Sequence, residues 1–128
     1  MTEPIWLTND LVLSIHDEQL GQFGGPPGLR DQGLLESALG RPLNKYAYGR
    51  TDLAELAAAY AFGLARNRAF VDGNKRIAFL AMVTFLGLND IDFAVPEAEA
   101  VVIMLGVASG EIDEDGLARW IRDNWPDG

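Results

Sequence analysis

The residues best suited to chemistry lie in one stretch near the middle of the chain, residues 67–76, with the sequence NRAFVDGNKR. Counted with Arg66, the stretch holds four of the ten lysines and arginines, whereas the whole chain has a net charge of −9. It also carries Asp72 and Gly73, and a strongly apolar segment follows it directly. A positive cluster that opens into an apolar segment predicts an anion-binding loop at a helix start.

Two cations of this stretch stand at the unfavourable end of the predicted helix. Lys75 and Arg76 fall in its first turn, where the helix dipole is already positive, so an anion is needed to offset the repulsion. The first backbone N–H groups of a helix have no partner inside it, and a glycine lets the backbone approach a ligand closely. The sequence therefore predicts a phosphate cradle made of Gly73, Asn74, Lys75 and Arg76.

Asp72 adds a carboxylate beside this cradle. Magnesium is commonly held by one or two protein carboxylates together with substrate phosphates, so Asp72 is a candidate metal ligand, and Phe70 is expected to pin the loop by burial. The alternative is an ordinary helix start, capped by Asp72 or Asn74, with two solvated cations. Neither the GxxxxGK[ST] nor the GxGxxG pattern is present.

Composition limits the class of protein. A chain of 128 residues with 48% hydrophobic residues suits one domain, residues 1–128. The absence of cysteine excludes disulfides and thiolate metal sites and fits the cytoplasm, and a single histidine, His16, excludes a multi-histidine metal site. The acidic balance disfavours a nucleic-acid partner.

No membrane segment is expected. The longest apolar run, residues 77–88, is about 12 residues long, against the roughly 20 that span a bilayer. The first residues lack the charged start and apolar run of a signal peptide. We therefore expect a cytoplasmic protein with no membrane partner.

Apolar spacing predicts an all-α bundle of five or six helices with almost no sheet. The helix at about 74–88 is apolar on nearly all sides beyond its first turn, so it is expected to be the central helix that the others surround. The other helices are expected from Thr8 or Asn9 to about Gly21, at 32–39, from Asp52 toward Arg66, from Pro96 to about Ala108, and from Asp113 or Glu114 onward.

Several connecting segments leave alternatives open. We expect residues 24–28, which are rich in glycine and proline, to form a loop. Gly40-Arg41-Pro42 is expected to end the second helix. Residues 43–50, with Tyr46 and Tyr48, are either a mobile flap over a site or a plain connection. Residues 4–7 are an extended arm or an edge strand. His16 is either a surface or boundary histidine or a functional contact.

The central stretch resembles a known signature. Residues 70–76 are similar to the Fic/Doc family motif, which reads H-x-F-x-[DE]-[GA]-N-K-R in its Doc branch. Residues 15–20, 24–39 with Arg41-Pro42, and 109–112 also resemble Doc-type "death on curing" toxins. The resemblance covers nearly the whole chain and implies the compact all-α Fic core.

The resemblance also implies an activity and partners. Doc-type toxins transfer phosphate from ATP to a threonine of elongation factor Tu and so block translation, and a Phd-like antitoxin lays its C-terminal segment into a groove beside the site. Fic-branch enzymes carry GNGRxxR and transfer AMP. Lys75 and Phe79 depart from that pattern, which favours the kinase over the AMP-transferase alternative.

Roles follow position by position from the same resemblance. Asp72 would hold Mg²⁺, and Arg66 would add a contact to phosphate or to the transition state. The nucleotide phosphates would be bound by Asn74, Lys75 and Arg76.

The chain departs from the family at one decisive position. Arg68 stands where the family has the histidine that accepts the proton of the attacking hydroxyl. A guanidinium stays charged and offers no acceptor lone pair, so it cannot serve as a general base. Three explanations follow: an engineered inactive toxin, a natural pseudoenzyme that still binds nucleotide or antitoxin, or a different catalytic base. We expect a site that binds ATP and does not react.

Overall fold

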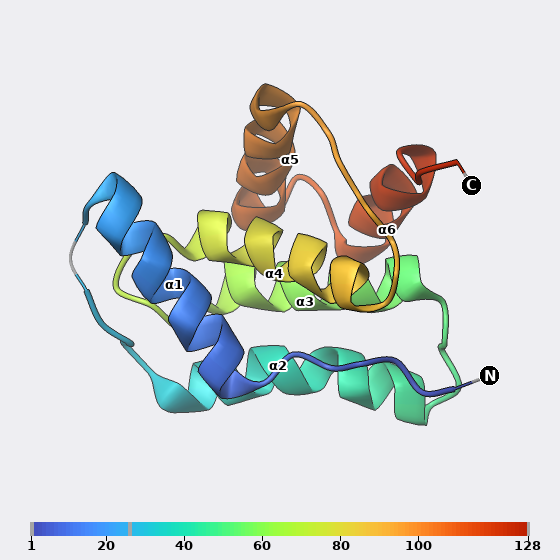
Figure 1. Ribbon diagram of the computed structural model, residues 1–128, viewed down its shortest axis with the longest axis horizontal. Helices are drawn as coiled ribbons and strands as arrows, with labels where there is room; N and C mark the ends of the chain where they lie inside the picture. The colour runs from blue at the N-terminus through green and yellow to red at the C-terminus, as the bar shows by residue number, and fades with distance from the viewer. Residues whose placement is uncertain (1, 26, 128) are drawn as a thin grey trace.

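The computed structural model describes residues 2–25 and 27–127, in which six α-helices form the regular structure (Figure 1). Within these ranges the only β geometry is an isolated bridge between Leu29 and Phe70, so the all-α prediction is confirmed. Pro26 of the expected Gly-Pro loop lies outside the described residues. The helices are α1 (Asn9–Phe23), α2 (Gln32–Ala47), α3 (Leu53–Asn67), α4 (Asn74–Leu88), α5 (Glu97–Ser109) and α6 (Glu114–Asp123).

Side-chain caps start four of the helices. Each capping oxygen accepts a hydrogen bond from a backbone N–H of the first turn, which that turn cannot satisfy by itself. The expected starts of the first, third and sixth helices are confirmed. The capping residues are Thr8, Asp31, Asp52 and Asp113.

The second helix is longer than expected, because α2 continues through Pro42 to Ala47. A proline inside a helix removes one hydrogen bond and costs about 3 kcal/mol. Here the ring of Pro42 is buried, and on either side of it in α2 the side chains of Arg41 and Lys45 both pair with Glu114 of α6. Burial and these tertiary contacts offset the local cost, so the predicted end of the helix at residues 40–42 was wrong.

The helix covered on most sides is α3, which packs against α2, α4, α5 and α6. Eleven of its fifteen residues are buried, most of them alanines, and small side chains let neighbouring helices approach from several directions. The helix expected at residues 74–88 is present as α4, but the expectation that the others surround it was wrong, because α3 takes that place. Helix α4 remains only half-buried at Phe79 and Leu80, because that side of α4 faces a groove.

The N-terminal residues form an extended arm and not a strand. The ring of Trp6 packs edge-on against Tyr46 of α2, with a centroid distance of 5.5 Å, and the Leu7 N–H donates to the Tyr60 hydroxyl at 3.0 Å. Tyr46 is therefore held by the arm, and Tyr48 is 88% exposed. Neither tyrosine lines the groove described below, so the structure does not support the flap alternative for residues 43–50.

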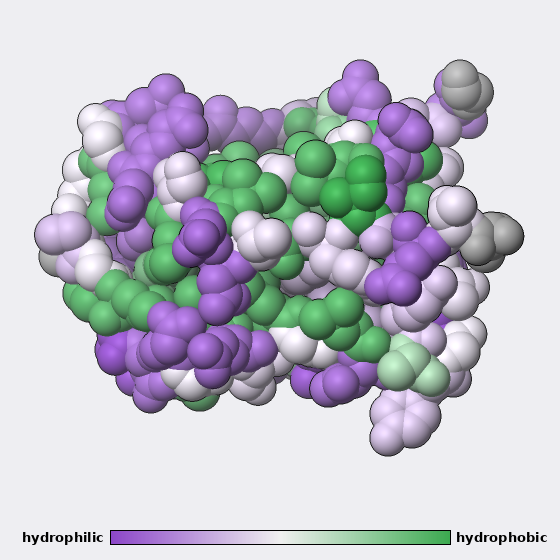
Figure 2. All heavy atoms as spheres, turned by 60° about the horizontal axis from the view of Figure 1, so that its bottom comes forward, coloured by the Kyte–Doolittle hydropathy of each residue, from purple (hydrophilic) through white to green (hydrophobic). Residues whose placement is uncertain are grey.

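The outer surface carries scattered apolar side chains. Figure 2, which turns the lower side of Figure 1 forward, shows apolar atoms interrupted by polar ones. Ile5 of the arm and Leu43 of α2 are among the exposed apolar residues. Across the described ranges, none of the helices combines the length and the apolar character that a membrane crossing requires.

Burial of Tyr60 predicts a loss of stability at high pH. Burial raises the pKa of its phenol from 10.0 to about 12, because the charged form is disfavoured in the core. The stabilisation is fully present below pH 10 and is lost as the pH rises toward 12, by about 2 kcal/mol. Urea unfolding at pH 9 and pH 12 should show this loss. Tyr60→Phe should flatten the dependence, and an unchanged slope in that variant would contradict the assignment.

Candidate functional site

The loop between α3 and α4, residues 68–73, is clamped by a segment that precedes α2. The N–H groups of Arg30 and Asp31 both donate to the carbonyl of Ala69, at 2.7 and 3.0 Å, and the N–H of Val71 donates to Gly28 at 3.2 Å. The Arg30 guanidinium donates to the carbonyl of Arg68 at 2.8 Å. These bonds join two segments about forty residues apart and fix the entrance to α4.

Asn74 holds the loop from the other side. Its side-chain Nδ2 donates to the carbonyl of Phe70 at 2.9 Å, and its Oδ1 accepts from the N–H of Phe70 at 3.0 Å. Phe70 itself is 2% exposed, as expected of a residue that pins the loop. The carboxamide predicted to contact phosphate is therefore engaged in shaping the loop, and Asn74 keeps only its backbone N–H for a ligand.

The first amides of α4 have no acceptor among the described residues. Gly73 stands at the N-cap with φ 78°, a left-handed conformation that suits glycine, and no side chain caps the helix. The first bond inside the helix runs from the Ile77 N–H to Gly73 O at 2.9 Å. The N–H groups of residues 74–76 thus remain available, so the alternative of a helix start capped by Asp72 or Asn74 is not supported.

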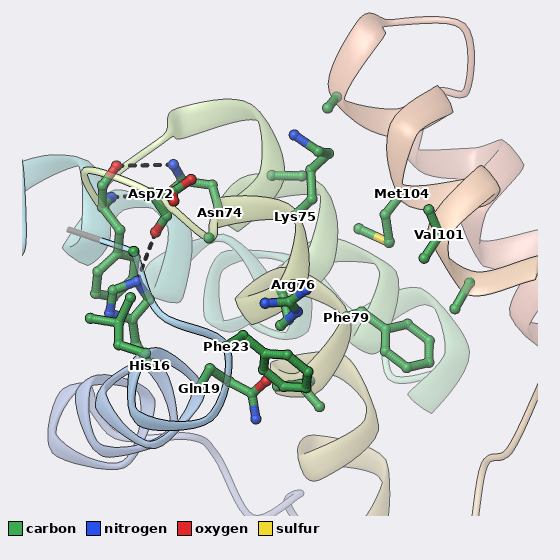
Figure 3. Close-up of a pocket in the computed structure, with 18 of the residues that line it drawn as sticks. His16, Gln19, Phe23, Asp72, Asn74, Lys75, Arg76, Phe79, Val101 and Met104 are labelled. Carbon is green, nitrogen blue, oxygen red and sulfur yellow. Dashed lines mark hydrogen bonds between the residues drawn. The ribbon is translucent and has the colours of Figure 1, made fainter. Parts of the chain in front are cut away.

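These amides stand at one end of a groove of about 1170 Å³ (Figure 3). The polar end is formed by α1 and by the loop that leads into α4. The opposite end lies between α4 and α5, and there the walls are apolar. The apolar lining residues are Phe79, Leu80, Val95, Ala100, Val101, Met104, Leu105 and Ala108.

The groove collects unpaired positive charge. Four cations line it, Arg30, Arg68, Lys75 and Arg76, against two acids, Asp72 and Glu97. The cations that do pair with carboxylates lie elsewhere; they are Arg41, Lys45, Arg50 and Arg122. Across residues 2–25 and 27–127, none of the groove cations pairs with a carboxylate. A local excess of positive charge in a protein of net charge −9 favours an anionic ligand.

Of the cations predicted to bind phosphate, Lys75 and Arg76 line the groove and Arg66 does not. Arg76 lies over the ring of Phe23 at 4.2 Å, and Lys75 lies apart from it on the same helix start (Figure 3). Arg66 is not among the groove residues. Its guanidinium instead lies over the ring of Phe62 at 5.6 Å, so the structure does not bring Arg66 to the predicted site.

The carboxylate of Asp72 lies at the groove beside Gly25. A Cβ placed at position 25 would lie only 3.0 Å from Oδ2 of Asp72, and Gly25 has φ 113°, so both space and backbone conformation favour glycine there. No cluster of three or more metal-ligating side chains occurs in the described part of the chain. Asp72 could hold a metal only together with ligand oxygens and water, which is how Mg²⁺ is commonly bound.

His16 is neither a surface nor a boundary residue, because it is 2% exposed. Its Nε2 lies 2.8 Å from the carbonyl oxygen of Asp72, and its ring stacks on Phe70 with centroids 3.9 Å apart. A carbonyl oxygen can only accept, so Nε2 carries the proton. Nε2 is therefore not available as the alternative proton acceptor.

Sequence reasoning missed several residues of the groove. Arg30 and Gly25 belong to the stretch at residues 24–31, whose resemblance to the family implies no role for them at the site. Phe23 and the apolar wall of α5 carried no signal apart from hydrophobicity. Arg30 gave no local sign of such a role, because Asp31 follows it directly and the two read as an ordinary pair of opposite charges.

Asn74→Ala should loosen the loop. It removes both side-chain bonds to Phe70 and leaves two backbone groups unpaired, a loss of about 2 kcal/mol. Urea unfolding measures this loss, and hydrogen exchange should become faster at residues 70–73. Asn74→Asp is the matched control, because an aspartate oxygen can still accept from the Phe70 N–H but cannot donate to the Phe70 carbonyl. The stability of this variant should lie between those of the original chain and Asn74→Ala. Equal stability of all three proteins would contradict this role.

Comparison with known proteins adds independent information. The sequence model of the Fic/DOC family matches residues 6–86. The chain is 35% identical over 113 residues to the protein kinase doc of Escherichia phage P1, covering 87% of this chain and 88% of that protein. It is 44% identical over 104 residues to toxin Doc of Mycolicibacterium smegmatis, covering 75% of this chain and 77% of that protein.

Proposed function

The chain belongs to the Fic/DOC family, and from this premise we propose that it is the toxin of a toxin–antitoxin module, built as a Doc-type protein kinase. One feature of the site supports this proposal in addition to family membership. The unpaired amides at the start of α4 and the unpaired cations Arg68, Lys75 and Arg76 gather at one end of the groove. A phosphate group satisfies both features at once.

The residues present fit ATP with Mg²⁺. The amides of residues 74–76, together with Lys75 and Arg76, would bind the phosphates, and Asp72 would hold the metal. Mg²⁺ would supply charge neutralisation between the phosphate oxygens. Asn74 would act through the loop geometry that its side chain fixes. Arg66 would reach a phosphate only after leaving Phe62.

We propose phosphate transfer to a protein hydroxyl, with a threonine of elongation factor Tu as the target and arrest of translation as the result. Lys75 occupies the position at which AMP-transferring members carry a second glycine, so transfer of AMP is the less favoured alternative. Phe79, which stands in place of the second arginine of that pattern, lines the apolar part of the groove. It therefore offers no charge to a nucleotide.

The chain itself is proposed to bind ATP without turning it over. Arg68 lines the groove at the family's histidine position, and its guanidinium cannot accept a proton. The imidazole Nε2 of His16 is already bound to a carbonyl. With Arg68 in place, this arrangement supports a pseudoenzyme that binds nucleotide or antitoxin.

The proposed protein partner is a Phd-like antitoxin whose C-terminal segment lies in the groove. The groove joins a positive end to an apolar end, which suits a peptide with acidic and apolar residues. Val101 and Leu105 line it and are still about half exposed, at 53% and 50%. Covering these side chains would contribute hydrophobic stabilisation to the complex.

Labelled ATP tests the proposal. The Arg68→His chain is incubated with ATP labelled at the γ or the α phosphate and with a translation extract, and labelled protein is measured. Label from the γ position alone is expected, and label from the α position would instead support AMP transfer. The unsubstituted chain should bind Mg·ATP in calorimetry and transfer neither label. No transfer by Arg68→His together with binding by both forms would favour a purely binding role.

A further inference from the structure

His16 connects α1 to the loop on which the phosphate cradle is built. The histidine and Asp72 are 56 positions apart in the sequence, yet Nε2 lies 2.8 Å from the Asp72 carbonyl oxygen (Figure 3). The ring stacks on Phe70 at 19° between planes. It also lies against Gly73, since a Cβ there would be 3.5 Å from Nε2. Three residues of the loop region, Phe70, Asp72 and Gly73, thus lie against one buried imidazole.

The hydrogen bond to Asp72 orients one peptide group. The described peptide bonds are all trans, and a trans peptide is planar, so its C=O and N–H point in opposite directions. Because the carbonyl of Asp72 faces His16, the N–H of Gly73 must face away from α1. The Gly73 N–H has no acceptor among the described residues. Its direction is therefore set by the Asp72 carbonyl of the same peptide group, which His16 holds.

This peptide needs an external restraint. Gly73 has φ 78°, and glycine populates several backbone regions at similar energy. The side chain of Asn74 restrains the backbone at Phe70, three residues earlier. In the described residues, His16 supplies the side-chain bond to the carbonyl of Asp72.

We infer that His16 is a positioning residue of this site. Its Nε2–H holds the Asp72 peptide, so that the Gly73 amide and the Asp72 side chain keep the orientation required by a phosphate–magnesium ligand. The inference rests on the proposed function for the identity of the ligand. Through His16, helix α1 would take a direct part in shaping the cradle, because the loop residues do not hold the Asp72 carbonyl by themselves.

The proton on Nε2 can be tested on the unsubstituted chain. Nitrogen-15 NMR of the imidazole should show a protonated Nε2 whose proton exchanges slowly and lies close to the protons of Gly73. Observation of His16 with its proton on Nδ1 alone and a bare Nε2 would overturn the inference. This measurement needs no variant and does not depend on ATP.

Two substitutions separate the hydrogen bond from the packing. His16→Phe keeps an aromatic ring on Phe70 and removes the donor, whereas His16→Gln keeps a donor and removes the ring. Calorimetry should show Mg·ATP binding weakened about fivefold to tenfold by His16→Phe and within about twofold of the original for His16→Gln. Equal affinity of the original chain and a folded His16→Phe would overturn the inference.

The backbone amide of Gly73 provides a readout that distinguishes this inference from the proposed function. Its NMR resonance should move in His16→Phe and stay nearly in place in His16→Gln. If the original chain binds no Mg·ATP, the proposed function fails, and the Gly73 resonance and the imidazole proton still decide the role of His16. If His16→Phe does not fold, the imidazole measurement on the original chain decides it.

Discussion

Replacing Arg68 with histidine should arrest bacterial growth when the variant is expressed without its antitoxin. The substitution restores a side chain that can accept the proton of the attacking hydroxyl, and general-base catalysis contributes about 10²–10⁴ in rate. The backbone is suited to the change, because Arg68 has φ 53° and ψ 52°, a left-handed conformation in which histidine is enriched. Colony counts after induction measure the effect.

The control for this experiment is Arg68→Asn. Asparagine also tolerates the left-handed conformation and removes the guanidinium, but its amide is not a general base. Cells that express Arg68→Asn should therefore grow, as should cells that express Arg68→His together with a Phd-like antitoxin. Normal growth with a well-folded Arg68→His protein would count against the toxin assignment.

Gly63→Val should destabilise the fold by about 3 kcal/mol or more. Gly63 lies in α3 where it meets α2, and a Cβ there would lie 3.1 Å from Cα of Ala38 and 3.3 Å from its carbonyl oxygen. These are backbone atoms of a buried helix, so they cannot turn aside as a long side chain would. Urea unfolding measures the loss.

Gly87→Ala is the matched control for the α2–α3 contact. Gly87 also lies in a helix, and no atom stands within 4 Å of a Cβ placed there, so alanine should stabilise α4 by up to about 1 kcal/mol. Opposite signs at the two glycines would show that close helix packing decides the result at Gly63. If Gly63→Val unfolds at the same urea concentration as the original chain, the close approach of α2 and α3 is refuted.

The α2–α3 contact also bears on the site. The segment that clamps the loop leads directly into α2, and the loop itself follows α3. Separation of the two helices would therefore weaken the bonds of Arg30 and Asp31 to Ala69. We therefore expect stability and the geometry of the loop at residues 68–73 to be coupled through this interface.

Helix starts could be predicted from the sequence because caps are local. The capping oxygens of Thr8, Asp52 and Asp113 reach a backbone N–H only three residues further on. The expected end of the second helix at residues 40–42 was wrong, because Pro42 is buried and Arg41 and Lys45 pair with Glu114, which is distant in the sequence. Local propensity is a weak guide where tertiary packing offsets its cost.

The chemistry of the loop was also evident in the sequence. Cations in the first turn of a helix, next to a glycine and a carboxylate, favour a compensating anion, because the helix dipole is already positive there. The same reasoning located Asp72, Lys75 and Arg76, which the structure places at the groove. The significance of Arg68, which cannot accept a proton, came from the family resemblance and not from this charge pattern.

The tertiary structure decided which side chains reach that loop. Arg66 is adjacent to it in sequence but lies over Phe62, whereas His16 is 56 positions from Asp72 and hydrogen-bonds to it. The sequence showed that α4 is apolar on nearly all sides beyond its first turn, but it could not show that Phe79 lines a groove instead of the core. The sequence alone determined where the helices begin and the charge of the loop, since both arise from neighbours along the chain. The groove and its buried histidine arise from the packing of helices far apart in sequence, which no local pattern encodes.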